Sequence, residues 1–176
     1  MGMEEIQRQS LVFTYGTLKK GFSNHTLIQH MISSNDAKFV GIYRTVDKFP
    51  LVCGPYRVPF LLNMPGSGDR VFGELYAVSP RGLDRMDELE GTTKGHYKRD
   101  QVKVRPAGSG GEAPSITAEV YFAGESYSGE LWRRCGERGV SSYTEKEAKG
   151  YVRRKDRPQN LTFLEQIWSF VNSDSD

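Results

Sequence analysis

The chain is built from short runs rich in β-branched and aromatic residues, separated by clusters of glycine, proline, serine and aspartate. Turn signals such as Gly54-Pro55 and the segment 65–69 end each run before it grows long. The strands predicted from these runs are 11–15, 39–46, 51–53, 59–63, 71–78, 97–105 and 116–123. Many short strands with few helices favour an α+β fold, here a small barrel-like sheet flanked by helices.

Helical spacing of apolar residues is limited to a few segments. One helix is expected to begin at Ser23 or Asn24, either of which is a suitable N-cap residue. A second is predicted over 80–90, because Ser79 suits its N-cap and Gly91 its C-terminal end. A third, at about 162–171, places its apolar residues on one face.

Three regions differ in composition. Residues 1–9 form a polar leader, 10–124 hold the predicted strands, and 125–176 form a charged extension. Strands 97–105 and 116–123 are expected to pair as a hairpin, with the glycine- and proline-rich loop 106–115 as a mobile tip. We expect the last helix to dock on the core, because its large aromatic residues are costly to expose.

Composition and charge argue against several classes of protein. The net charge of +2, with no strongly basic block, argues against a nucleic-acid surface. No apolar run approaches the roughly 20 residues that cross a bilayer, and the N-terminus is too acidic for a secretory signal. Cys53 and Cys135 lie far apart, and the histidines do not join them at metal-ligand spacings. These features predict a reduced, cytoplasmic, metal-free protein, and we expect a monomer.

Glu90 breaks the polar pattern of the predicted helix 80–90. On a helical projection it falls about 40° from the centre of the apolar stripe formed by Leu83, Met86 and Leu89. Burial and the helix dipole would both raise the pKa of a carboxyl group there, towards the range of a general base. The alternative is a terminal residue whose side chain bends into water.

The segment Tyr15-Gly16-Thr17-Leu18 ends the first predicted strand. Gly16 permits a turn with positive φ, or lets a ligand approach the backbone closely. Amide groups left unpaired after a strand can bind a carboxylate or an oxyanion. The alternative is an ordinary turn.

These residues together resemble a known family. The stretches that carry the resemblance are Phe13–Gly21 with Asn24-His25, then 49–52 with 58–62, 65–68 with 71–78, and 83–90 with 97–99. In order and spacing they are similar to the γ-glutamylamine cyclotransferase group of the γ-glutamylcyclotransferase-like superfamily, which includes avirulence-induced plant proteins. The resemblance covers about residues 10–123, and the chain departs from the compact animal relatives after about 125.

The resemblance implies a β-barrel flanked by helices, no cofactor, and a small-molecule γ-glutamyl substrate. It places the substrate-binding loop at Tyr15, Gly16, Thr17 and Leu18 and the catalytic acid/base at Glu90. The expected reaction is intramolecular aminolysis, which releases 5-oxoproline and an amine. Because the substrate attacks itself, no protein nucleophile is needed, and Cys53 fits a core position better than a catalytic one. Tyr97 is expected either to line the pocket or only to pack.

Two other functions stay open on the sequence alone. One is a catalytically silent module that binds a small carboxylate and acts through partners of the 125–176 extension. The other is a hydrolase in which Glu90 activates water and releases glutamate. The leaving group of a cyclotransferase substrate is also undetermined: a γ-glutamyl dipeptide, glutathione and γ-glutamyl-ε-lysine all fit.

Overall fold

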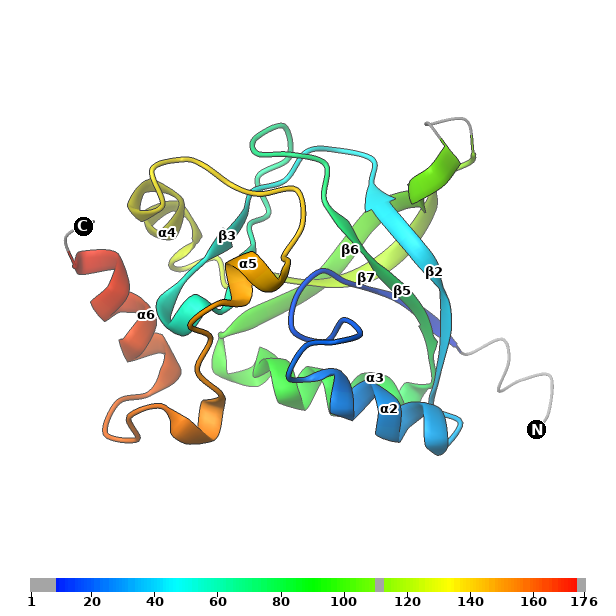
Figure 1. The fold of residues 1–176 in the computed structure, drawn as a ribbon, viewed down its shortest axis with the longest axis horizontal. Helices are drawn as coiled ribbons and strands as arrows, with labels where there is room; N and C mark the ends of the chain where they lie inside the picture. Colours follow the sequence, from blue (N-terminus) through cyan, green and yellow to red (C-terminus); the bar gives the residue numbers. More distant parts are fainter. Residues whose placement is uncertain (1–8, 110–112, 174–176) are drawn as a thin grey trace.

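A computed structural model describes residues 9–109 and 113–173. Its sheet has the strand order β1-β5-β2-β6-β7-β4-β3 (Figure 1). The strands are β1 (Ser10–Thr14), β2 (Ala37–Thr45), β3 (Leu51–Cys53), β4 (Pro59–Leu61), β5 (Phe72–Val78), β6 (Tyr97–Pro106) and β7 (Ile116–Ala123). Every predicted strand is present, with shifts of no more than a few residues at its ends.

Five strands close into a barrel. Antiparallel pairing links β1, β5, β2, β6 and β7, and a parallel bridge between Val12 and Glu119 joins β7 back to β1. The predicted hairpin is the β6–β7 pair; its tip lies partly outside the described residues. The expected α+β fold, a small mixed barrel flanked by helices, is confirmed.

One edge of β7 pairs first with β1 and then with β4. Glu119 pairs with Val12 of β1, whereas three residues later Phe122 pairs with Leu61 of β4. The other edge of β7 is occupied by β6 throughout. The chain leaving β1 therefore has no place in the sheet beyond this point, and it must turn out of the wall beside the start of β4.

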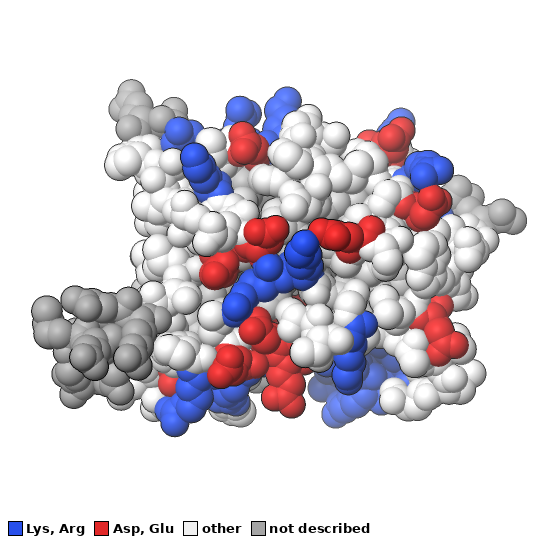
Figure 2. Space-filling view, turned by 180° about the vertical axis from the view of Figure 1, so that it is seen from behind, with Lys and Arg blue, Asp and Glu red and all other residues white. Residues whose placement is uncertain are grey.

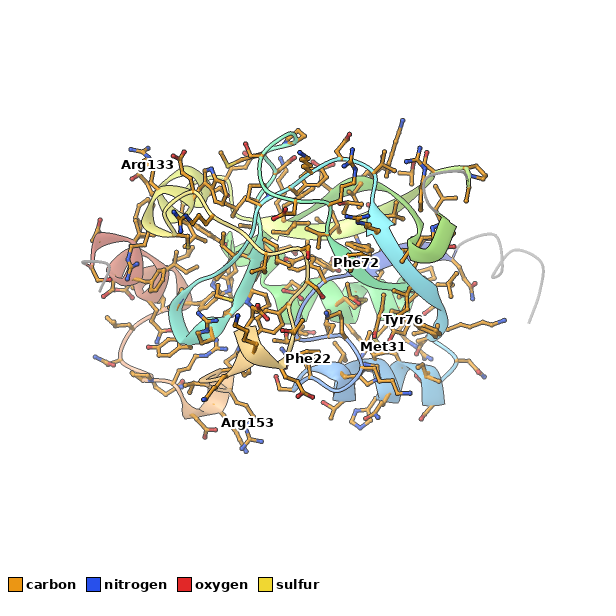
Figure 3. The ribbon with its side chains drawn as sticks, turned by 45° about the horizontal axis from the view of Figure 1, so that its top comes forward. Phe22, Met31, Phe72, Tyr76, Arg133 and Arg153 are labelled. Atoms are coloured by element: carbon orange, nitrogen blue, oxygen red, sulfur yellow. The ribbon has the colours of Figure 1, made fainter. Side chains whose placement is uncertain are left out.

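Helices pack beside and below the barrel (Figure 1). They are α2 (His25–Ser33), α3 (Pro80–Glu90), α4 (Ser128–Arg134), α5 (Glu145–Ala148) and α6 (Phe163–Asn172). The sequence identifies both ends of α3 correctly: the Ser79 hydroxyl accepts from the Gly82 N–H at 3.0 Å, and Gly91 adopts the left-handed conformation with φ 63°. In Figure 3, Met31 of α2 and Tyr76 of β5 lie between helix and sheet, and both belong to the core.

The N-terminal end of α3 is fixed by a buried carboxylate. Asp36 accepts hydrogen bonds from Ser79 and Ser34, each at 2.7 Å, and pairs with Arg81 at 2.9 Å. Burial acts to raise the pKa of Asp36, but the hydrogen bonds and the Arg81 charge outweigh it and lower that pKa to about 2. This cluster joins the end of α2 to the start of the helix that carries Glu90.

The segment after 125 contributes to the same core as the barrel. The buried hydrophobic side chains form two clusters, of which the first contains Phe60. This first cluster includes the fully buried Tyr127, Leu131 and Ile167, and the second includes the fully buried Tyr143. The expected C-terminal helix is α6, which lies beside α4 (Figure 1). Burying these large side chains is favourable by about 1.5–3 kcal/mol each.

The residue expected to cap α2 is in place, but it does not cap the helix with its side chain. Asn24 does precede α2, but its side chain makes no capping hydrogen bond. It donates instead to the Thr17 hydroxyl at 2.8 Å, because the loop after β1 folds back over the start of the helix.

The surface carries mixed charge on the face seen in Figure 2, where acidic and basic side chains alternate without a single-sign patch. Among the described residues, no helix is long and apolar enough to cross a membrane. In the same part of the chain, no group of three or more histidine, cysteine, aspartate or glutamate side chains is placed to hold a metal. Cys53 and Cys135 are both free thiols.

Replacing Asp36 by alanine is expected to lower the free energy of unfolding by about 2 kcal/mol, because three donors lose their shared acceptor. Since the folded-state pKa lies below the unfolded value of 3.8, the contribution of Asp36 is complete above about pH 4 and is lost as the pH falls towards 2. Urea unfolding of the wild type and Asp36→Ala from pH 7 to pH 2 measures both effects. The control is Asp84→Ala, an exposed aspartate on α3, and an equal loss there would contradict the assignment.

Candidate active site

A cavity of about 50 Å³ opens where β1 leaves the barrel. The loop after β1, the end of α3, four strands (β1, β4, β6 and β7) and the segment after 150 all contribute to its wall. The polar and charged residues in the lining are Thr14, Tyr15, Thr17, Asn24, Glu90, Tyr97, Tyr121, Tyr151, Arg154 and Arg157. The structure thus brings Glu90 and the segment 15–18, which are 72 residues or more apart in sequence, to one hollow.

Gly16 is required by a close approach to β4. A Cβ added at this position would lie 2.4 Å from Cγ of Pro59, well inside van der Waals contact. The sequence suggested two reasons for glycine here, a turn with positive φ or a close approach to the backbone. Gly16 does not have a positive φ, so the first reason is wrong. The partner change along β7 brings the two segments this close.

The backbone after Tyr15 has unpaired N–H donors in residues that line the cavity. None of the hydrogen bonds formed among the described residues uses the N–H of Gly16, Thr17 or Leu18. The carbonyl groups of the same residues are engaged, with Lys19 N–H, Asn24 N–H and Nδ1 of His25 respectively. Fixed carbonyls hold the loop in shape while the three amides stay available, which is the arrangement that binds a carboxylate or an oxyanion.

Glu90 is half-buried at the last position of α3. Burial raises the pKa of its carboxyl group to about 7, and the positive charge of Arg154 only partly opposes this. The side chain makes no ion pair with a described residue. A carboxyl group that is near half-ionised at neutral pH can both accept and donate a proton.

Tyrosine hydroxyls connect the loop to α3. Tyr15 donates to the carbonyl of Tyr121 at 2.5 Å, and the Tyr121 hydroxyl donates to Asp87 at 2.7 Å. Asp87 lies one helical turn before Glu90 and also pairs with Arg99 at 3.1 Å. Burial and the nearby Glu90 charge raise the pKa of Tyr15 well above its usual value, so its phenol stays neutral. The chain of bonds fixes the last turn of α3 relative to the loop.

Tyr97 both packs and lines the cavity, so its two expected roles are not exclusive. Its ring stacks on Phe60 at 5.3 Å between centroids, and its hydroxyl donates to the carbonyl of Pro59 at 3.0 Å. This bond holds β4 at the place where Gly16 passes.

Sequence reasoning missed the contribution of the extension. Tyr151, Arg154, Arg157 and Phe163 all line the cavity. Arg154 donates to the carbonyl of Leu89 at 3.0 Å, at the C-terminal end of α3 where a positive charge is favoured. No local pattern marked these residues, because the extension reads as a solvated charged run until its path in space is known.

Comparison with known proteins identifies the family of this chain. The family model described as "Gamma-glutamyl cyclotransferase, AIG2-like" matches residues 12–139. The chain belongs to this family. A protein of Arabidopsis thaliana named "Putative gamma-glutamylcyclotransferase" is 58% identical over 95% of this chain and 94% of its own length.

Animal members of the AIG2-like family are similar over less of the chain. The human gamma-glutamylaminecyclotransferase is 39% identical over 64% of this chain and 76% of its own length. The crystal structure of an AIG2-like protein from Mus musculus superposes with a TM-score of 0.72 at 32% identity, covering 85% of this chain and 99% of that one. The resemblance identified from the sequence is confirmed.

The raised pKa of Glu90 has a measurable effect on stability. Because the folded-state pKa, about 7, lies above the reference value of 4.5, protonated Glu90 stabilises the fold below about pH 4.5, and this contribution is lost as the pH rises through 7. The Glu90→Gln protein is therefore expected to match the wild type near pH 4 and to exceed it in free energy of unfolding at pH 8. Denaturant unfolding at both values checks this. A difference that does not change with pH would contradict the raised pKa.

Proposed function

We propose that this protein catalyses the intramolecular aminolysis of a γ-glutamyl amide, releasing 5-oxoproline and a free amine, with Glu90 as the acid/base group. Membership of the cyclotransferase family supports the reaction type. The single observation that supports the assignment of residues is that Glu90 and the unpaired amides of Gly16, Thr17 and Leu18 line one cavity.

The reaction needs proton transfer at both nitrogens. The α-amino group of the substrate, with a reference pKa near 8, is mostly protonated at neutral pH and must lose a proton before it attacks the γ-carbonyl carbon. Attack forms the five-membered ring, and the bond to the leaving nitrogen then breaks. Over the whole reaction, the attacking nitrogen loses two protons and the leaving nitrogen gains two. Glu90, with a pKa of about 7, is suited to carry protons between them.

The loop amides supply the complementary charge. Attack on the carbonyl carbon places negative charge on its oxygen, and N–H groups aimed at that oxygen stabilise it without reorganisation. The same three amides also suit the α-carboxylate of the glutamyl group. Holding the amino group close to the carbonyl is itself a large part of catalysis, since effective molarities of about 10⁵–10⁸ M are known for well-oriented intramolecular reactions.

The two other functions considered from the sequence lack comparable support. A silent binding module does not need a half-buried carboxyl group with a pKa of about 7 facing the binding loop. A hydrolase would release glutamate, and mass spectrometry of the products distinguishes it from the cyclising enzyme. Three expectations concern the protein as a whole. They are a cytoplasmic location, a monomeric state and a function related to glutathione metabolism.

The Glu90→Gln variant is expected to remain folded and to lose about 10²–10⁴-fold in kcat, because glutamine cannot exchange a proton with the substrate. In the wild type, kcat/KM is expected to rise with pH through about 7 as Glu90 ionises. Formation of 5-oxoproline from γ-glutamyl substrates measures both.

The matched control is Glu88→Gln, an exposed glutamate on the same helix, which should keep wild-type activity. A folded Glu90→Gln protein with undiminished turnover would exclude Glu90 from the mechanism. If the wild type releases no 5-oxoproline from any γ-glutamyl substrate, the proposed function itself is refuted.

The Gly16→Ala variant tests the loop. Its methyl group would meet Pro59, so the loop must move and the amides lose their alignment. Loss of one such donor typically lowers kcat about 10²–10³-fold. Gly129→Ala is the matched control, because nothing lies within 4 Å of a Cβ there. Equal activity of the two variants would show that the position of the loop does not matter.

A further inference from the structure

Arg157 is a buried guanidinium without a carboxylate partner. It is 7% exposed, yet it takes part in none of the ion pairs formed by the described residues. A charge removed from water is costly unless an opposite charge or hydrogen bonds compensate it. Its neutral contacts satisfy only part of its hydrogen-bonding capacity: Nε donates to the carbonyl of Val152 at 2.8 Å and Nη2 to the Tyr151 hydroxyl at 3.3 Å.

Aromatic rings hold this guanidinium in place. Its central carbon lies 5.5–5.6 Å from the ring centroids of Tyr56, Tyr151 and Phe163, within the range of cation–π attraction. The rings come from the β3–β4 connection and from two parts of the extension. The arginine is therefore fixed before any ligand arrives, and no hydrogen bond among the described residues uses its Nη1.

Arg157 lies between the reaction cavity and a second hollow. The second hollow has a volume of about 260 Å³, and it shares Arg154, Arg157 and Phe163 with the cavity that contains Glu90. Among the described residues that line it, Lys94 adds a third cationic side chain, and none is acidic. The wall that the two hollows share is therefore cationic, and all the charged side chains that line the second hollow are positive.

The substrate half that extends outwards is the leaving amine. The glutamyl half must place its amino group and γ-carbonyl at Glu90 and at the amides of Gly16–Leu18, which also provide donors for its own carboxylate. The atoms beyond the cleaved bond can then face the wall formed by Arg154, Arg157 and Phe163, which the cavity shares with the second hollow. Arginine binds a carboxylate by paired, charge-assisted hydrogen bonds.

We propose that Arg157, with Arg154 beside it, binds a carboxylate on the leaving amine, so that the enzyme prefers γ-glutamyl amides of amino acids over those of neutral amines. This inference rests on the proposed function and adds the class of leaving group to it.

The test compares substrate pairs that differ only in this carboxylate. One pair is γ-glutamyl-alanine and γ-glutamyl-alaninamide, and the other is γ-glutamyl-ε-lysine and γ-glutamyl-1,5-diaminopentane. For the wild-type full chain, kcat/KM for 5-oxoproline release is expected to favour the carboxylate in at least one pair by about 10- to 100-fold. In Arg157→Gln this ratio should fall to near one.

The ratio is a suitable readout because a loss of folded protein lowers both members of a pair equally. Arg157→Lys, which keeps the charge but not the paired donors, should give an intermediate ratio. Arg153→Gln is the matched control and should keep the wild-type ratio: its side chain is 62% exposed and points away from the body of the molecule (Figure 3).

Two outcomes would overturn the proposal. The first is a wild-type ratio near one in both pairs. The second is a preference that survives in Arg157→Gln; if this variant slows both members of each pair equally, the arginine is assigned to the glutamyl half or to the fold. A wild type that releases no 5-oxoproline from any of the four compounds refutes the proposed function first, and the inference with it.

Discussion

The sharing of one edge of β7 between two strands determines where the site can form. A five-stranded barrel that closed along its whole length would leave no opening in its wall. Here β1 pairs with β7 only as far as Val12–Glu119, and β4 takes over at Leu61–Phe122. The chain leaving β1 is pushed outwards against Pro59, with room for glycine alone at position 16. The unpaired amides of the loop are a direct consequence, because the strand that would have accepted their hydrogen bonds belongs to a different segment.

The second constraint is the placement of one carboxyl group at the end of a helix fixed at both ends. Asp36 anchors the start of α3, and the Tyr121–Asp87 hydrogen bond holds its last turn against the barrel. Glu90 is then held half-buried facing neutral phenols, and burial raises its pKa to about 7. Fixed geometry and a tuned proton affinity arise from the same packing, so neither can be changed without the other.

The extension joins this arrangement from a distant part of the sequence. Its buried residues complete the hydrophobic core, and Arg154 and Arg157 reach the cavity from the outside. Family members that lack a similar segment would have a different wall on this side. The extension therefore belongs to the site as well as to the fold, which its charged composition conceals.

Local chemistry in the sequence was sufficient to predict most of the elements. The strands follow from runs of β-branched and aromatic residues, and the ends of α3 from Ser79 and Gly91, because both signals act over a few neighbouring residues. The same logic failed at Asn24, whose side chain serves the loop, and it gave no signal for Arg157. Only the tertiary structure decided that β1 and β4 share one edge of β7, and hence why Gly16 must be glycine and which charges surround Glu90. Such contacts join residues tens of positions apart, and no local rule of spacing or propensity includes their energies.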